Sequence, residues 1–366
     1  MEVDFLTENL TEYLSLLGKI IPTHSQIPIL SSVLLEVTPT DFILSATDLE
    51  FGVRISIPCK IAGVGGVLVP GRQFVEILSS LTHEKAKIKQ EKDQVVLTAG
   101  SGSFKFQVLP RDEFPRLYEE KGDKMGEYSP AHFQNIFSKL IFAVSQDESR
   151  PHLTGIYVVK REGEVDYVAT DGYRLSLKRV KDASATQDAA GMIISPRLIG
   201  EGLSLKGQNI FLYIHKTGNQ AILESGGALL VGRLIEGAYP DYEKVVPKEL
   251  KTSIKLDREE LLRLLKVTSV FARENANIIN CNVTLGALHL QVDSSSLGEA
   301  ESKIDGEQVG DDNHIAFNVK FLLDFLRSVD GKTVTLQISS PFEPALFTTD
   351  DDPDFFHVIM PVRVQE

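Results

Sequence analysis

The chain has 366 residues, of which 42% are hydrophobic and 24% are charged, and this composition is typical of a soluble globular protein with two or three domains. Its N-terminus lacks a basic region before an apolar run, and no stretch approaches the roughly 18 apolar residues that span a bilayer, so we expect neither a signal peptide nor a membrane segment. Its two cysteines form no CxxC motif, and we expect a cytoplasmic protein. The net charge of −13 argues mildly against a nucleic-acid-binding protein, because such proteins usually carry a basic surface.

The first third of the chain is predicted to contain the same unit twice. Apolar residues at helical spacing predict a helix over 7–19. Runs rich in Val, Ile and Leu then predict strands at 32–37, 41–46 and 50–57, and the Gly-rich run 63–66 is predicted to be a loop. A strand at 67–69, a helix at 72–81 and strands at 86–90, 94–98 and 103–109 follow. The unit is therefore a strand, a helix and three strands.

The other two thirds repeat this order at a spacing near 124 residues. The words SATD, VATD and LQVD end at Asp48, Asp171 and Asp293, which are 123 and 122 residues apart. Further helices are predicted at 130–144, 196–205, 257–271 and 319–329. A repeat of this length is a whole domain rather than a solenoid unit.

Polar stretches without periodicity, at 119–127 and 248–253, suggest where the domains end. We therefore predict three domains over residues 1–122, 123–250 and 251–366, and we interpret the polar stretch 181–190 as a surface loop within the second. Helices on one face of largely antiparallel sheets make each domain an α+β domain.

Motifs for catalysis, metals or cofactors are not evident in the sequence. The run 330–333 (DGKT) resembles the end of a phosphate-binding loop, but Leu326 stands where that motif needs a glycine. The Thr-Asp pairs at 47–48 and 170–171 fall at strand ends, where such residues usually bond local backbone. The acidic run 350–352 lacks the spaced ligands of a calcium loop, and we interpret it as a solvated turn. We predict no catalytic residue, no metal and no cofactor.

Basic residues recur at one position of the repeat. Arg72, Arg197 and Lys320 are 125 and 123 residues apart, and each is predicted to begin the second helix of its domain. Three equivalent basic residues suggest one shared positive face. This answers the objection from net charge, because acidic residues on the other surfaces can surround a basic channel. Phosphate contacts in such a channel would give affinity without sequence reading. We predict that these three residues, together with His24, face double-stranded DNA.

These features, taken with several short words, resemble the bacterial sliding clamp family, the beta subunits of the replicative DNA polymerase. The resemblance covers essentially the whole chain, and its most specific words are ATDGYRL at 169–175 and MPVR at 360–363. It implies the DNA clamp fold: a head-to-tail homodimer that closes six domains into a ring, with helices inside and sheets outside. It also implies that the ring tethers the replicative polymerase, is opened by an ATP-driven clamp loader, serves other polymerases and repair proteins, and catalyses nothing.

The resemblance further implies a groove between the second and third domains for short linear motifs of partners. Its residues would be Leu153, Thr170, Gly172, Tyr173, Arg174, Leu175, Pro240, Lys244, Val245, Phe321, Pro344, Val358, Met360, Pro361, Val362 and Arg363. Leu175, Val245 and Met360 would form an apolar floor, and Arg174 and Arg363 would supply donors at the rim. Tyr173 stands where a His is common in the family, Lys244 where some members have Arg, and Gln365 and Glu366 extend past the usual ending.

The dimer seam implied by the resemblance pairs an edge strand of the first domain, 103–109, with the third domain. Its residues would be Phe104, Lys105, Phe106, Val270, Phe271, Glu299 and Glu301. An edge strand with two Phe on one face is an aggregation liability unless another chain covers it. Two other hypotheses stay open at this point: a repeat-built enzyme with a cleft between domains, and an interaction scaffold that does not act on DNA.

Overall fold

The computed structural model describes residues 1–23, 25–81, 84–118, 120–183, 191–294 and 297–363. His24, Gln365 and Glu366 therefore lie outside the described residues, as do 184–190 of the predicted surface loop. The chain divides into two compact units, Met1–Gln134 with Arg197–Leu234, and Asn135–Pro196 with Ile235–Glu366. This division cuts through the second predicted domain, so the boundaries proposed from the sequence stay a prediction.

The predicted order of strand, helix and three strands occurs six times in the described residues. The first two copies are β1 (Glu2–Leu6), α1 (Glu8–Ile20), β2 (Ser32–Val37), β3 (Phe42–Thr47) and β4 (Phe51–Ile57), then β6 (Gly65–Pro70), α2 (Gly71–Ser80), β7 (Lys85–Glu91), β8 (Gln94–Ala99) and β9 (Gly102–Gln107). The next two are β10 (Asp123–Tyr128), α3 (Pro130–Ser138), β11 (Ile156–Arg161), β12 (Glu164–Thr170) and β13 (Arg174–Lys181), then β14 (Met192–Ile194), α4 (Pro196–Gly202), β15 (Ile210–His215), β16 (Gln220–Ser225) and β17 (Ala228–Ile235). The last two are β18 (Thr252–Asp257), α5 (Arg258–Ala272), β19 (Ile278–Thr284), β20 (Ala287–Ser294) and β21 (Gly298–Asp305), then β23 (Asn313–Asn318), α6 (Val319–Ser328), β24 (Thr333–Ile338), β25 (Ala345–Thr349) and β26 (Asp352–Ile359).

Two further strands, β5 (Cys59–Gly63) and β22 (Glu307–Gly310), stand outside this pattern. The predicted loop at 63–66 is therefore wrong, because β5 ends at Gly63 and β6 begins at Gly65, which pairs with Val37. Gly65 has a φ of 149°, in the region that favours glycine, so the glycines here serve a sharp change of direction between two strands. The predicted helix 130–144 is also too long, since α3 ends at Ser138 and a short 3-10 turn at Ile141–Ala143 follows.

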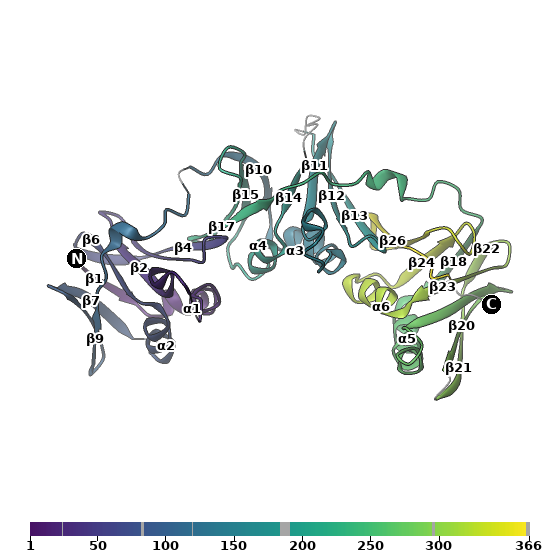
Figure 1. Ribbon diagram of the computed structural model, residues 1–366, viewed down its shortest axis with the longest axis horizontal. Helices are drawn as coiled ribbons and strands as arrows, with labels where there is room; N and C mark the ends of the chain where they lie inside the picture. The colour runs from purple at the N-terminus through teal and green to yellow at the C-terminus, as the bar shows by residue number, and fades with distance from the viewer. Residues whose placement is uncertain (24, 82–83, 119, 184–190, 295–296, 364–366) are drawn as a thin grey trace. The chain divides into compact units, whose positions relative to one another are not determined.

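The first unit contains two antiparallel sheets. One has the strand order β5-β1-β7-β8-β9, and the other runs β10-β15-β16-β17-β4-β3-β2-β6. Helices α1 and α2 lie side by side and pack against β2, β3 and β4 (Figure 1). Val33 and Leu35 of β2 are fully buried.

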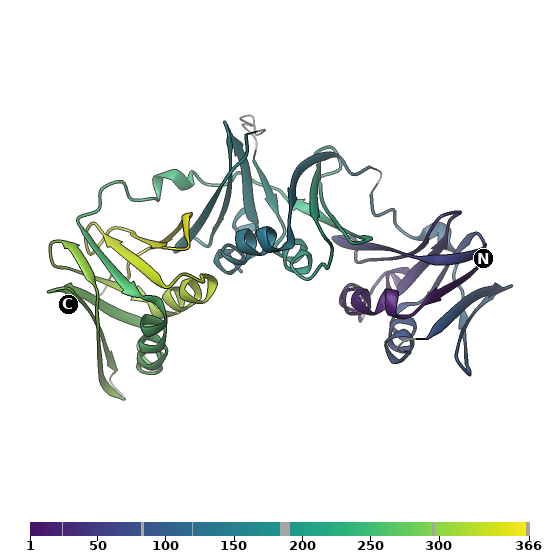
Figure 2. The same ribbon diagram turned by 180° about the vertical axis from the view of Figure 1, so that it is seen from behind.

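The second unit also contains two antiparallel sheets, with the orders β14-β11-β12-β13-β26-β25-β24-β18-β22 and β21-β20-β19-β23. Helices α5 and α6 lie side by side, which is also seen from behind (Figure 2), and they share one core with both sheets. Asp257 caps α5 by accepting a hydrogen bond from the Glu260 amide at 2.8 Å. The β13–β26 pairing joins the second repeat to the third and forms the base of the site described next. Among the described residues, no helix has both the length and the apolar character needed to cross a membrane.

Candidate functional site

A cavity of about 430 Å³ lies in the second unit, above the β13–β26 pairing. Most of the residues that the sequence predicts for a peptide groove line it, and they come from segments far apart in the chain. These residues are Leu153, Thr170, Gly172, Arg174, Leu175, Pro240, Lys244, Val245, Pro344, Val358 and Met360. His152 and Tyr242 also line it and were not predicted. We call this cavity the groove.

The floor of the groove is apolar because it is the outer side of a buried cluster. Leu175 and Val358 pair across β13 and β26 and are almost fully buried, and Leu153 is buried beside them. Met360 follows β26, donates its backbone N–H to the Tyr173 carbonyl at 2.8 Å, and remains 37% exposed. An exposed Met at the edge of an apolar floor offers a side chain that adapts its shape to what it contacts.

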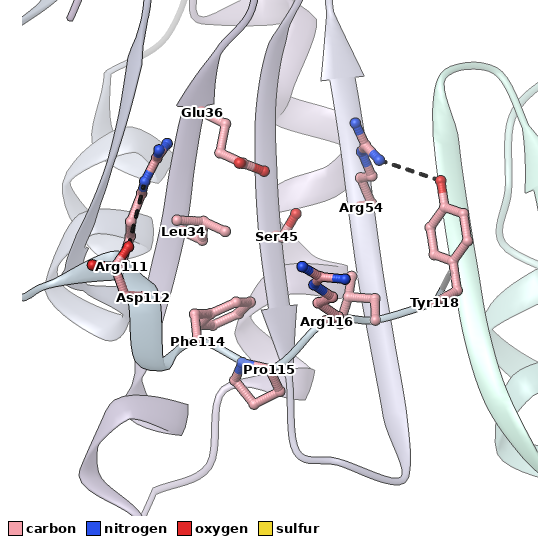
Figure 3. A pocket seen from close by; sticks show the side chains of 11 residues that line it. Leu34, Glu36, Ser45, Arg54, Arg111, Asp112, Phe114, Pro115, Arg116 and Tyr118 are labelled. Atoms are coloured by element: carbon pink, nitrogen blue, oxygen red, sulfur yellow. Dashed lines mark hydrogen bonds and ion pairs between the residues drawn. The ribbon is translucent and has the colours of Figure 1, made fainter. Parts of the chain in front are cut away.

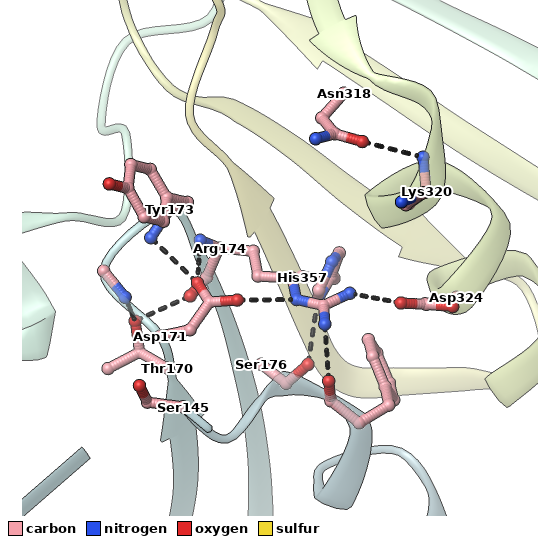
Figure 4. Close-up of polar contacts among 12 residues, drawn as sticks. Ser145, Thr170, Asp171, Tyr173, Arg174, Ser176, Asn318, Lys320, Asp324 and His357 are labelled. Carbon is pink, nitrogen blue, oxygen red and sulfur yellow. Dashed lines mark hydrogen bonds and ion pairs between the residues drawn. The ribbon is translucent and has the colours of Figure 1, made fainter. Parts of the chain in front are cut away.

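The turn between β12 and β13 forms one wall and is built by local hydrogen bonds (Figure 4). The Thr170 hydroxyl accepts the Gly172 N–H at 3.0 Å, and Asp171 accepts the N–H groups of Tyr173 and Arg174 at 2.9 and 3.0 Å. Gly172 has a φ of 92°, where a glycine is favoured. Thr47 and Asp48 make the same bonds in the first repeat, as expected for pairs that shape turns.

Arg174 lines the groove, and its guanidinium is bound by groups of the same chain. It donates to Asp171 at 3.1 Å, to Asp324 of α6 at 2.7 Å and to the Phe142 carbonyl at 2.6 Å (Figure 4). It also lies over the rings of Phe142 and Phe321. The side chain is only 10% exposed and holds the turn against α6, so its role as a donor to a ligand stays a prediction. Phe321 contacts Arg174 but, unlike Arg174, does not line the cavity.

His357 lies beneath the floor and was missed in the sequence, because no metal or catalytic spacing marks it. It is fully buried, its Nδ1 lies 2.8 Å from the Ser176 hydroxyl, and its ring stacks on Phe325 at 5.2 Å. Burial, with a smaller effect of the Arg174 charge, lowers the pKa of His357 to about 3. The imidazole is therefore neutral at neutral pH and acts as a rigid, flat support for Val358.

The other predicted groove residues lie outside the cavity lining. Tyr173 is 62% exposed, Arg363 is exposed, and Pro361 and Val362 are half-buried. Val362 donates its N–H to the Ala316 carbonyl at 2.8 Å, which holds the end of the described chain against β23. Lys244 lines the mouth and pairs with Asp241 at 2.9 Å. The groove therefore has an apolar floor with a basic group at its edge.

The three repeated basic residues occupy the predicted position. Arg72, Arg197 and Lys320 are each the second residue of α2, α4 and α6, and all three side chains are exposed. Arg197 is tied down, because it forms an ion pair with Asp48 and lies over the Phe51 ring. Among the described residues, the side chains of Arg72 and Lys320 have no hydrogen-bond or ion-pair partner. These two are therefore the more available cations.

The predicted seam strand is an edge strand, since β8 is the one strand with which β9 pairs among the described residues. Phe106, however, is 6% exposed and packs edge-on against Phe74 of α2, so it belongs to the core of its own unit. Alternation puts Phe104 on the same face, where it is half-buried, and leaves Lys105 exposed on the other. Phe106 therefore offers little apolar surface for a seam in the isolated chain, and its part in the seam stays a prediction.

The residues predicted to face this strand lie beside another edge strand, β21. Val270 of α5 is 49% exposed, and Val267, one turn earlier, is 58% exposed. Phe271 is only half-buried against the core. Glu299 and Glu301 are exposed on β21. Helix α5 packs on β21, so these apolar and acidic side chains belong to one region of the second unit.

The acidic run 350–352 is not wholly solvated, which corrects the interpretation of the sequence. Asp352 is 6% exposed and accepts hydrogen bonds from the buried Lys139 and Lys178. Burial raises the pKa of Asp352, but the hydrogen bonds from the two lysines outweigh that effect, and the net shift is downward. In the described ranges, no three His, Cys, Asp or Glu side chains gather where they could hold a metal ion.

This buried cluster predicts a pH dependence. The folded-state pKa of Asp352 lies below its ordinary value of 3.8, so its contribution to stability is complete above that pH and is lost as the pH falls further. We expect the free energy of unfolding, measured with urea, to decline as the pH falls below about 4. Asp352→Asn should flatten this decline, whereas Asp311→Asn, at an exposed aspartate, should not. An equally steep decline in both variants would contradict the assignment.

Comparisons with known proteins agree along the whole chain. Models of the DNA polymerase III beta subunit match in order: its N-terminal domain to residues 1–118, its central domain to 127–241 and its C-terminal domain to 243–363. The beta sliding clamp of Chlamydia muridarum is 27% identical over 348 residues, which are 95% of this chain and 94% of that protein.

Solved structures give the same result. The DNA polymerase III subunit beta of Pseudomonas aeruginosa superposes with a TM-score of 0.91 at 27% identity, over 99% of this chain and 100% of that one. A Pseudomonas aeruginosa sliding clamp bound to griselimycin gives a TM-score of 0.93 at 26% identity, over 100% of both chains. The fold of six repeated units and these matches establish that the chain belongs to the family of bacterial beta sliding clamps, the beta subunits of DNA polymerase III.

Proposed function

We propose that two copies of this chain pair head to tail into a closed ring around duplex DNA, and that the groove holds short segments of client proteins. The clients would be the replicative polymerase, the clamp loader, and other polymerases and repair proteins. The observation that carries the proposal is the groove itself, an apolar cavity assembled from the second and third repeats at the end of β26. A ring that tethers many proteins needs one such site that several of them can share.

The chemistry of the groove supports a peptide ligand with apolar anchors. Its floor of Leu175 and Val358 is buried and rigid, and Met360 stands at its edge with freedom to adjust. Gly172, whose positive φ favours a glycine, has no Cβ at that wall, so a peptide backbone can approach closely there. A Leu or Phe anchor, with a polar residue such as Gln upstream, would fill this cavity. The affinity should be roughly micromolar, about −8 kcal/mol.

The two free edge strands support the head-to-tail pairing. Strand β9 exposes Lys105, whereas β21 exposes Glu299 and Glu301, and within the described ranges each strand has one side without a paired strand. A heterologous contact of this kind closes into a ring when its rotation is suitable. The apolar part of the contact would come from Val267 and Val270 rather than from Phe106.

We also propose that the chain is not itself an enzyme and needs no cofactor. The residues that an enzyme hypothesis would use have other roles: Thr170 and Asp171 shape a turn, and Asp352 pairs with buried lysines. The scaffold hypothesis shares the groove, but it gives no reason for exposed basic residues at one position of every repeat. That difference allows a direct test.

The test removes the three basic side chains together. In a dimeric ring, the triple variant Arg72→Ala, Arg197→Ala and Lys320→Ala removes six cations. We expect weaker retention of loaded rings on nicked circular DNA, measured by gel filtration. Added salt should also reduce the retention of the variant less than that of the parent, because each phosphate contact contributes about one unit to the slope of log K against log salt. Since Arg197 is paired with Asp48, the double variant Arg72→Ala and Lys320→Ala should account for most of the effect.

A charge-matched control separates position from net charge. Lys92, Lys248 and Lys332 are exposed and have no side-chain partner among the described residues. Replacing these three with Ala changes the net charge equally, and the variant should be retained on DNA as the parent is. Equal retention of both triple variants at every salt concentration would favour a scaffold that does not act on DNA.

A further inference from the structure

A second cavity, of about 460 Å³, lies in the first unit and is lined by three arginines (Figure 3). Arg54 projects from β4, while Arg111 and Arg116 belong to the segment that follows β9. The remaining residues of the lining are Leu34, Glu36, Ser45, Asp112, Phe114, Pro115, Leu117 and Tyr118. We call this cavity the arginine pocket. Three cations in one pocket stand out in a chain whose net charge is −13.

None of the three arginines is strongly paired with a carboxylate in the part of the chain that the structure describes. Arg54 donates to the Tyr118 hydroxyl at 3.3 Å, an uncharged partner that orients the guanidinium without cancelling its charge (Figure 3). Arg111 reaches Asp112 only at 4.0 Å, and both side chains are mostly exposed, so this ion pair is weak. Among the described residues, Arg116 has no hydrogen-bond or ion-pair partner. The pocket therefore presents donors that an anionic ligand can use.

The pocket also has an apolar side and an unused acceptor. Leu34 and Phe114 are buried together beneath it, and Pro115 and Leu117 add apolar surface. Glu36 is half-buried and has no hydrogen-bond or ion-pair partner among the described residues. A carboxylate in this position would repel any anion placed directly against it, but it would accept a backbone N–H, which a peptide has and a phosphate chain lacks. The combination suits a peptide with acidic and apolar side chains better than it suits a nucleic acid.

The repeat relates the arginine pocket to the groove. Pro115 and Leu117 line the arginine pocket, and Pro240 and Tyr242, each 125 residues later, line the groove. The same part of the repeat thus contributes to a cavity twice, with an arginine-rich lining in the first copy and an apolar lining in the second. Side chains alternate along β2, and Val33 and Leu35 are buried on the face that carries α1 and α2. Leu34 and Glu36, which line the arginine pocket, therefore lie on the opposite face of the sheet.

We infer that the arginine pocket is a second docking site, for an acidic linear segment of a partner protein with one apolar anchor. This inference rests on the proposed function in one respect. If the helix-bearing face turns toward DNA in the ring, the arginine pocket, on the opposite face of the sheet, is left open to a partner protein. The partner's carboxylates would pair with Arg111 and Arg116, and its Leu or Phe side chain would rest on Phe114. Glu36 would accept an N–H of the extended backbone.

The experiment measures binding of a labelled heptapeptide by fluorescence anisotropy. The peptide has five Asp or Glu residues around one Leu-Phe pair, and its control has Asn and Gln in place of the acids. We expect the triple variant Arg54→Gln, Arg111→Gln and Arg116→Gln to raise the Kd about tenfold or more, as the loss of charge-assisted hydrogen bonds would. Lys92→Gln with Lys248→Gln and Lys332→Gln should leave it unchanged. The control peptide should bind at least about tenfold more weakly than the acidic one.

Two further variants keep the result interpretable. Arg116→Gln alone, at an exposed residue, should weaken binding without any change in the unfolding transition, so misfolding cannot account for the loss. Met360→Ala should bind the acidic peptide as the parent does, because that residue belongs to the groove. If binding of the acidic peptide does not depend on the arginines, this inference is overturned. The proposed function stands in that case, provided that DNA retention and binding of the groove peptide are normal. Displacement of the peptide by an oligo-dT strand with the same arginine dependence would overturn the peptide assignment in favour of a nucleic acid.

Discussion

Removal of residues 360–366 is expected to abolish binding of a groove peptide while leaving the fold intact. The truncation ends the chain at Ile359, so all of β26 and its pairing with β13 remain. It removes the Met360 side chain and the bonds from Met360 to Tyr173 and from Val362 to Ala316. Calorimetry with an eight-residue peptide that carries Gln and a Leu-Phe anchor would measure the effect. Met360→Ala alone should weaken binding about tenfold, close to 1.4 kcal/mol.

A matched Met-to-Ala variant provides the control. Met125 is half-buried on β10, outside the groove lining, so Met125→Ala makes the same change in side chain elsewhere. Its affinity for the peptide should equal that of the parent. If the truncated protein also binds with the parent's dissociation constant, the cavity at the end of β26 is not the client site.

Conversion of the exposed apolar residues of α5 to aspartates is expected to give soluble monomers. Val267 and Val270 are 58% and 49% exposed in the isolated chain, so the double change Val267→Asp and Val270→Asp should cost the fold little. In the proposed dimer it would bury two carboxylates per seam without partners, opposite an edge strand that carries only one basic residue, Lys105. Each such burial is costly. Sedimentation velocity would detect the change in mass.

The control uses a more exposed apolar residue of the same repeat. Val309 of β22 is 72% exposed, and Val309→Asp should leave the assembly unchanged. The thermal unfolding transition of Val309→Asp should match that of the parent. The double variant should unfold at a lower temperature only by the amount of stability that dimerisation gives to the parent. A double variant that still sediments as a dimer would put the seam away from α5.

The sequence predicted the architecture well because the repeat supplies three readings of one pattern. The predicted helix 72–81 is shifted by one residue from α2, and the predicted helix 319–329 extends one residue beyond α6. The errors fall where local pattern is ambiguous. The run 63–66 was interpreted as a loop, although its glycines belong to β5 and β6 and allow the chain to change direction between these two strands. The apolar residues after Ser138 continue the helical period, but the backbone there forms a 3-10 turn.

The composition of the groove could be predicted from the resemblance, but the role of each residue could not. Arg174 has a partner, Asp324, that is 150 residues away, and no local pattern reveals that this bond turns the guanidinium inward. Phe104 and Phe106 were correctly put on one face of an edge strand, yet alternation alone cannot say which face meets the core. Contacts with α2 decide that, and they depend on tertiary packing.

Single-particle images of the purified protein test the central claim most directly. The account predicts closed rings with a central hole wide enough for duplex DNA, and a solution mass of twice the 40.5 kDa of one chain. Arcs or isolated particles of the mass of one chain, at concentrations where the protein is retained on DNA, would contradict the proposal that this chain encircles DNA as a head-to-tail dimer.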